Sequence, residues 1–255
     1  MEIQLTPRQT TTSSVLKTAG GWRLEIPAGP PHTYRLAQVD DYTRIPRSRL
    51  RHTTPWCLSL RVRISSADLS GTWGFGLWND PFGLSLGFGG GAGRLPTLPQ
   101  AVWFMYASPP NWLSLRDNPE TIPANGFFAG TFRSAHIPST LFTPCLLAIP
   151  LCAIHPLSRL LRRLSGQIIH QDAASIKVDV TQWHEYSFQW LPDSCLFRVD
   201  GNEILHTTCS PLSPLGLVLW IDNQFAAWNP NGQMGYGTLE NPAAWMEIEK
   251  LNAPV

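Results

Sequence analysis

Two short polar clusters follow apolar segments in this chain and carry side chains that could hold a ligand or move a proton. They are Trp78-Asn79-Asp80 and Trp220-Ile221-Asp222-Asn223-Gln224. An indole ring stacks on flat apolar surfaces such as a sugar ring, while amides and carboxylates fix the orientation of a ligand. If the protein is an enzyme, Asp80 and Asp222 are the candidate acid–base residues, because burial raises the pKa of a carboxyl group. The alternative is that each Asp only caps a turn at the end of its strand.

The segment leading into the first cluster, residues 71–81, alternates and predicts a strand. One face carries Trp73, Phe75 and Leu77, and the other carries Gly74, Gly76, Trp78 and Asp80. We expect the first face to fill the core. Two glycines weaken a strand unless something lies close to its backbone. Gly74 and Gly76 therefore predict a floor cleared for a ligand, and the alternative is close packing of the protein's own sheet or loops over them.

Residues 100–106 form a nearly continuous apolar run, which is typical of a buried strand. Trp103 and Tyr106 are further candidate ligand contacts on it. One parity of this strand faces the core and the other faces the ligand side, and the sequence does not decide which. The candidate ligand-binding set is thus Gly74, Gly76, Trp78, Asn79, Trp103, Tyr106, Trp220, Asn223 and Gln224.

The elements that must position these side chains are clearest in residues 179–205. His184, Tyr186, Phe188 and Trp190 alternate with polar residues, as a half-buried strand does. Turn residues follow at 192–194, and a second alternating run ends in Asp200-Gly201, a hairpin signal. Three consecutive antiparallel strands favour an all-β sandwich or barrel.

This stretch resembles the W-H-x-Y-x-F-x-W-x-P and F-x-V-D-G pattern of glycoside hydrolase family 16, in the concanavalin A-like lectin/glucanase superfamily. Residues 215–251 are similar to the last two strands of that family. The resemblance implies a concanavalin A-like jelly-roll sandwich of two antiparallel sheets, with residues 71–81 and 217–224 on its concave sheet. Both polar clusters would then converge on one Trp-lined cleft.

The carboxylates that the hydrolases of this family use are missing at the expected place. The family carries E-x-D-x-x-E on the strand after the Trp73–Trp78 segment, and a retaining glycosidase needs two carboxyl groups about 5 Å apart. No Asp or Glu lies between Asp80 and Asp117. Glu247 and Glu249 are also spaced for one face, but the resemblance places their strand on the outer sheet. Classical glycoside hydrolysis is therefore disfavoured.

Residues 138–172 have no counterpart in the family pattern and predict an apolar and helical insertion. Residues 141–154 are almost entirely apolar, and residues 156–166 predict a short helix with Pro at its start and Gly at its end. Its leucines (157, 160, 161, 164) would share one face and its arginines (159, 162, 163) the other. Three interpretations stay open: a hydrophobic lid over the cleft, a peripheral membrane contact through residues 141–165, or an arm covering a sheet edge or a dimer contact.

Length and composition fit one large β domain. The chain has 255 residues with a net charge of +1, which gives no electrostatic basis for binding nucleic acid. We expect a flexible tail over residues 1–20 and a single domain over 21–255. No signal peptide pattern is visible, and the five scattered cysteines suit neither disulfides nor zinc, so we expect a cytoplasmic protein without metal or cofactor. The sequence does not indicate an oligomeric state.

Three functional hypotheses follow. The first is a binding protein that holds a saccharide-containing or partly apolar ligand in the cleft without hydrolysing it. The second is a cyclase or isomerase that acts on a lipophilic small molecule through Asp80 or Asp222. The third is a glycoside hydrolase with displaced carboxylates. The expected partner is in each case a small molecule or a glycan.

Overall fold

The computed structural model describes residues 4–81, 94–117, 121–135 and 154–253. These residues form two antiparallel sheets of seven strands each, a two-stranded hairpin and an α-helix. The predicted all-β jelly-roll sandwich with a short helical insertion is confirmed. In the described ranges, no helix is both long and apolar enough to cross a membrane.

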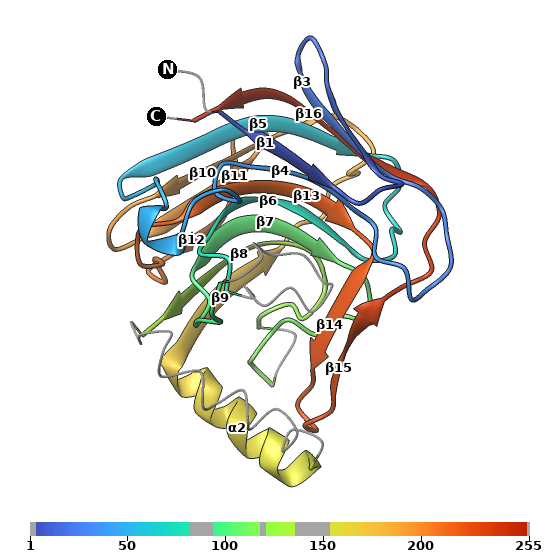
Figure 1. Ribbon diagram of the computed structural model, residues 1–255. Helices are drawn as coiled ribbons and strands as arrows, with labels where there is room; N and C mark the ends of the chain where they lie inside the picture. Colours follow the sequence, from blue (N-terminus) through green and yellow to red (C-terminus); the bar gives the residue numbers. More distant parts are fainter. Residues whose placement is uncertain (1–3, 82–93, 118–120, 136–153, 254–255) are drawn as a thin grey trace.

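The concave sheet carries the candidate site. Its strands, in spatial order, are β1 (Thr6–Gln9), β4 (Leu36–Asp40), β13 (Gly216–Asp222), β6 (Thr72–Trp78), β7 (Ala101–Ala107), β8 (Gly126–Ser134) and β9 (Ile169–Ser175). Figure 1 shows this sheet curving over the space in which helix α2 (His155–Ile168) and the hairpin of β14 (Gln224–Trp228) and β15 (Met234–Thr238) lie. The short 3-10 helix η1 (Arg47–Arg49) follows β4.

The convex sheet covers the other side of the core. Its strands, in spatial order, are β12 (Asn202–Thr207), β11 (Cys195–Val199), β10 (His184–Trp190), β5 (Trp56–Ile64), β16 (Ala244–Asn252), β3 (Gly21–Ile26) and β2 (Ser14–Lys17). The three consecutive strands predicted within residues 179–205 are β10, β11 and β12, paired side by side.

The core lies between the sheets and follows the predicted alternation. Trp73, Phe75 and Leu77 of β6 are buried in it, as are Tyr186 and Phe188 of β10. Phe75 and Tyr186 come from opposite sheets and meet in an edge-to-face contact with their ring centroids 5.3 Å apart, a geometry that aromatic pairs favour. Because alternate residues of a strand point to opposite faces, the residues buried in this core also determine which side chains lie on the outer faces of the two sheets.

The N-terminal segment differs from the flexible tail expected over residues 1–20. β1 pairs with β4 and β2 pairs with β3, so each forms the edge of one sheet. The turn between them is closed by a hydrogen bond between the hydroxyl groups of Thr10 and Ser13 at 2.8 Å. The expectation of a tail was wrong for residues 6–17. An edge strand pairs with the sheet along one side only, so its sequence can be as polar as that of a tail.

Helix α2 confirms the predicted helix, but the insertion ends earlier than expected. β9 begins at Ile169 and pairs with β8 along its whole length, so residues 169–172 belong to the concave sheet. The apolar residues 138–153 lie outside the described residues.

Candidate functional site

The face of the concave sheet turned away from the core is mainly aromatic. Trp103 of β7 is its centre, with ring centroids at 6.0 Å from Trp78, 5.9 Å from Trp220 and 6.1 Å from Phe132. Trp103 and Trp220 are each 8 % exposed, whereas Trp78 and Phe132 are half-buried. We call Trp78, Trp103 and Phe132 the aromatic platform. Phe132 was not among the predicted ligand contacts, although it lies four residues after Phe128 and therefore on the same face of β8.

Tyr106 belongs to the core rather than to this face. Its ring stacks on Trp73 at 5.7 Å, and its hydroxyl group donates to the carbonyl oxygen of Leu69 at 3.1 Å. Trp103 and Tyr106 have opposite parity on β7, so only one of the two could face the ligand side. Tyr106 is therefore withdrawn as a candidate ligand contact.

The two glycines of β6 make room for the protein's own neighbours. A Cβ atom on Gly74 would lie 2.5 Å from the carbonyl oxygen of Phe104 and 2.7 Å from Cη2 of Trp220. Gly76 has φ +153°, and a Cβ atom there would lie 2.6 Å from Cα of Trp103. The prediction of a floor cleared for a ligand was wrong, because Trp220 and the backbone of β7 occupy that space.

Asp222 sits in a buried polar cluster at one end of β13. Its carboxylate accepts hydrogen bonds from the hydroxyl group of Thr72 at 2.8 Å and from the backbone N–H of Gln224 at 3.1 Å, and Tyr34 Oη lies at 3.5 Å. Thr72 also accepts from the indole N–H of Trp220 at 2.9 Å. Burial raises the pKa of Asp222 to about 6, which is more than these hydrogen bonds lower it.

Asp80 lies at the other end of the same strand pair. In the register of β6 and β13, Asp222 is opposite Thr72 whereas Gly216 is opposite Trp78, so roughly 20 Å of strand separates Asp222 from the end near Asp80. The carboxylate of Asp80 is fully buried and forms an ion pair with Arg94 at 2.6 Å. The expected convergence of the two acids on one cleft was wrong, because antiparallel pairing sends the C-terminal ends of β6 and β13 in opposite directions.

Two of the three candidate amides have structural roles. Asn79 clamps the chain before β7, since its Nδ2 donates to Leu98 O at 2.9 Å and its Oδ1 accepts from the N–H of Gln100 at 3.0 Å. Asn223 is fully buried, and its Oδ1 accepts from the backbone N–H of Arg35 at 2.9 Å. Gln224 differs from both, because its buried Nε2 has no hydrogen-bond acceptor among the described residues.

The strand that should carry the catalytic carboxylates in the hydrolase pattern presents apolar side chains. Ala101, Trp103 and Met105 of β7 point to the ligand side and are all buried. Among the described strands of the concave sheet, two carboxylates face this side, Asp40 and Asp222. They are offset by four residues along the pair of β4 and β13, roughly 13 Å, which exceeds the spacing of about 5–9.5 Å that glycosidases use.

Asp40 is also committed to its own loop. One carboxylate oxygen accepts from the backbone N–H of Tyr42 at 3.0 Å, and the other from the hydroxyl group of Thr43 at 2.6 Å and from Gln38 Nε2 at 2.7 Å. Among the described residues, no group of three His, Cys, Asp or Glu side chains could hold a metal ion.

Glu247 and Glu249 lie on the outer face of the convex sheet, as the resemblance implied. Arg63 binds Glu247 at 2.6 Å and Arg61 approaches Glu249 at 3.5 Å. The core separates both carboxylates from the aromatic platform, so they cannot act on a ligand held there.

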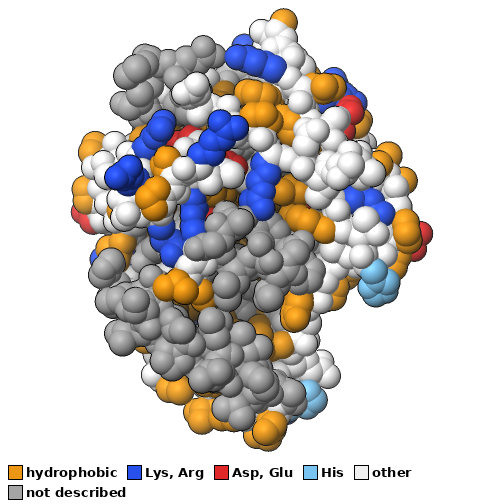
Figure 2. All heavy atoms as spheres, in the orientation of Figure 1, with side chains coloured by type: hydrophobic (Ala, Val, Ile, Leu, Met, Phe, Trp, Pro, Cys, Tyr) orange, Lys and Arg blue, Asp and Glu red, His pale blue; other side chains and the backbone are white. Residues whose placement is uncertain are grey.

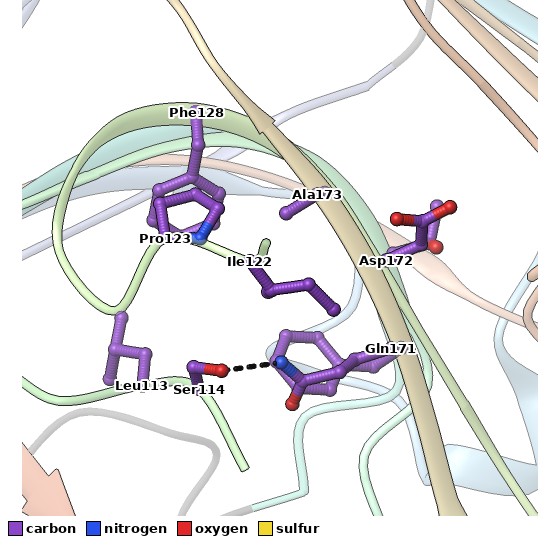
Figure 3. Close-up of a pocket in the computed structure, with 11 residues that line it drawn as sticks. Leu113, Ser114, Ile122, Pro123, Phe128, Gln171, Asp172 and Ala173 are labelled. Carbon is purple, nitrogen blue, oxygen red and sulfur yellow. Dashed lines mark hydrogen bonds between the residues drawn. The ribbon is translucent and has the colours of Figure 1, made fainter. Parts of the chain in front are cut away.

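A small cavity lies beside the platform, lined by β8, β9, Leu113, Ser114, Ile122 and Pro123 (Figure 3). Its volume of about 10 Å³ holds roughly one water molecule. Gln171 forms part of its wall and donates from Nε2 to the hydroxyl group of Ser114 at 2.8 Å. The cavity is too small for a sugar ring.

Comparisons with known proteins give similarity only at the level of three-dimensional structure; neither a family model nor a curated sequence matches the chain. LamAcat from Zobellia galactanivorans is 13 % identical, with 92 % of this chain and 77 % of that chain covered at a TM-score of 0.46. A legume lectin-like domain from Entamoeba histolytica is 7 % identical, with 95 % and 87 % covered at 0.47. A Bacillus licheniformis β-glucanase is 11 % identical, with 94 % and 82 % covered at 0.45. Likeness at this level says nothing about activity.

Proposed function

We propose that this protein binds a saccharide on the aromatic face of its concave sheet without hydrolysing it. The observation that carries the proposal is the set of side chains on β7, where Ala101, Trp103 and Met105 stand in place of carboxylates. The carboxylates that remain on this face are too far apart for a double-displacement or a single-displacement mechanism. In the part of the chain that the structure describes, this face has aromatic rings of the kind that stack on sugars and has no pair of carboxylates at the spacing that cleaves them.

The half-buried rings of the platform are where the ligand would lie. Trp78 and Phe132 flank Ala101 across three neighbouring strands, because β7 pairs Ala101 with Trp78 on one side and with Phe132 on the other. The indole N–H of Trp78 donates to the hydroxyl group of Tyr42 at 2.6 Å, which fixes the plane of its ring. A ring held in one orientation loses little conformational entropy when a sugar stacks on it.

An array of immobilised oligosaccharides tests this proposal. We expect wild-type protein to be retained by at least one glycan. Trp78→Ala should weaken retention by about tenfold, because packing of the apolar face of a sugar on an aromatic ring contributes on the order of 1 kcal/mol or more. Trp245→Ala is the matched control, since this half-buried Trp lies on the convex sheet. Equal losses in both variants, or no retention of the wild type, would contradict the proposal.

One observation favours a second candidate function. Asp222 is a buried carboxyl group with a pKa raised to about 6, next to the hydroxyl groups of Thr72 and Tyr34, and such groups are common at sites of proton transfer. It would support the cyclase or isomerase hypothesis. Asp80 is less suited to that role, because Arg94 holds its carboxylate in an ion pair. Co-purification of a lipophilic molecule whose turnover is lost in Asp222→Asn would favour this function over saccharide binding.

A further inference from the structure

Helix α2 rests on the protein by its polar side. Arg162 is 2 % exposed, and its guanidinium donates to the carbonyl oxygen of Trp228 at 2.8 Å and to that of Ser114 at 2.9 Å, and pairs with Asp117. The buried hydroxyl group of Ser158 accepts from the indole N–H of Trp228 at 3.0 Å. These contacts fix the rotation of the helix about its own axis.

The apolar side of α2 is consequently turned outward. Leu160 is 51 % exposed, Leu164 47 % and Ile168 38 %, and the preceding Ile154 is 55 % exposed. Leu160, Leu164 and Ile168 are spaced by four residues and form one stripe along the helix. This orientation is opposite to the one that a lid over the concave sheet needs, so the predicted lid is not what the helix forms. Hydrophobic side chains line the lower edge of the molecule in Figure 2, where Figure 1 places α2.

The charged side chains that α2 itself contributes have one sign. Helix α2 contains three arginines and no Asp or Glu, and Arg159 and Arg163 are both exposed. Arg162 is used for anchoring. The exposed Arg159 also donates from Nε to the carbonyl oxygen of Asn231 at 2.7 Å, which holds its charge beside the apolar stripe together with that of Arg163. A cationic helix with an exposed apolar stripe matches the surface of an anionic bilayer, where acyl chains lie beneath phosphate groups.

The size and place of the stripe favour a bilayer over a second copy of the chain. The four exposed apolar side chains are each only 38–55 % exposed, so together they offer far less than the roughly 800 Å² that each partner buries in a stable protein interface. Helix α2 also lies at the extreme edge of the molecule, on the side away from the sandwich (Figure 1).

We propose that α2 is a docking surface for anionic membranes, with Leu160, Leu164 and Ile168 entering the interface and Arg159 and Arg163 contacting lipid phosphates. The anchor through Arg162 holds the stripe outward before contact, so little ordering is needed on binding. The proposal is independent of saccharide binding, because α2 shares no residue with the aromatic platform.

Co-sedimentation of the full chain with lipid vesicles tests the docking surface. We expect wild type to bind vesicles of phosphatidylcholine with phosphatidylserine and to bind pure phosphatidylcholine vesicles several-fold more weakly. The double variant Leu160→Glu with Leu164→Glu should lose binding to both by more than about tenfold. Arg163→Glu should lose about fivefold or more on the anionic vesicles alone, because each cation near the surface adds a small increment.

Leu16→Glu is the matched control, since Leu16 is 50 % exposed but lies on edge strand β2 of the convex sheet. It should bind vesicles as wild type does. A second double variant, Leu160→Ser with Leu164→Ser, keeps the test decisive if the glutamates disturb the helix, and circular dichroism confirms folding in each case. The proposal would be overturned if wild type fails to sediment with vesicles or if a double variant binds them normally. It would also be overturned if light scattering shows a dimer that the double variant abolishes while wild type binds no vesicles.

Discussion

At the scale of single residues, Asp222 shows how burial sets the chemistry of this face. Thr72 orients the carboxylate and at the same time accepts from Trp220, so one hydroxyl group links a carboxyl group to an aromatic ring of the concave sheet. The sequence places Asp222 and Trp220 in one polar cluster but gives no sign of Thr72 or Tyr34. Thr72 lies at the start of β6 and Tyr34 just before β4, both far away in the chain. Only the pairing of β13 with β6 and β4 brings these residues together.

The raised pKa of Asp222 predicts a pH dependence of stability. A carboxyl group whose pKa rises from 3.8 when unfolded to about 6 when folded favours the folded state at low pH. That contribution is fully present below about pH 4 and is lost as pH rises through about 6, and it amounts to about 2–3 kcal/mol. We compare the free energies of unfolding of wild type and Asp222→Asn in urea titrations. The difference, wild type minus variant, should fall by this amount between pH 4 and pH 7. A difference that does not change with pH would show that Asp222 is not the group responsible.

Gly76 is expected to be among the least replaceable residues of the concave sheet. A Cβ atom there would lie 2.4 Å from the carbonyl oxygen of Val102, and the φ of +153° is one that other residues rarely adopt. Gly76→Ala should lower the free energy of unfolding by about 2–4 kcal/mol. Gly166→Ala in α2 is the control. Among the described residues outside the helix, the nearest atom to its Cβ position is the carbonyl oxygen of Leu115 at 3.8 Å, so this variant should raise stability by about 0.5–1 kcal/mol. Chemical denaturation of both variants checks the pair, and similar effects would contradict the packing described.

At the scale of elements, alternation predicted which strand faces are buried but not where strands end up relative to each other. The core faces of β6 and β10 were both predicted from the alternation of their side chains. The relation of Asp80 to Asp222 was not, because it depends on the direction in which two distant strands pair. Helix α2 shows the same limit, since its amphipathic pattern is evident in the sequence but its rotation is set by Arg162 and its partners on other elements.

Arg162 should therefore matter far more than its neighbour in sequence. Arg162→Ala removes hydrogen bonds to the carbonyl oxygens of Trp228 and Ser114 and should cost about 2–4 kcal/mol of stability, with faster hydrogen exchange in α2. Arg163→Ala, at an exposed position of the same helix, should change the free energy of unfolding by less than about 0.5 kcal/mol and should leave hydrogen exchange in α2 as in wild type. Equal effects of the two substitutions would mean that α2 is held by its other contacts.

At the scale of the whole molecule, the sandwich keeps the platform and α2 apart as two surfaces. The platform lies on the concave sheet, and α2 projects from its rim beyond β9 (Figure 1). A membrane bound by α2 would hold the molecule by one edge and leave the convex sheet facing away from the helix. Each surface can be disabled by substitutions that leave the other intact, so the two proposals can fail separately.

If this β-sandwich binds saccharides without cleaving them, a bound glycan must keep its chain length. Each oligosaccharide that retains the wild-type protein on the array is incubated with it in solution, and the products are weighed by mass spectrometry. We predict that every such glycan keeps its full mass. Shortened glycans that disappear in Asp222→Asn or in an Asp40→Asn variant would show that the distant carboxylates do act on the bond, and would contradict the account.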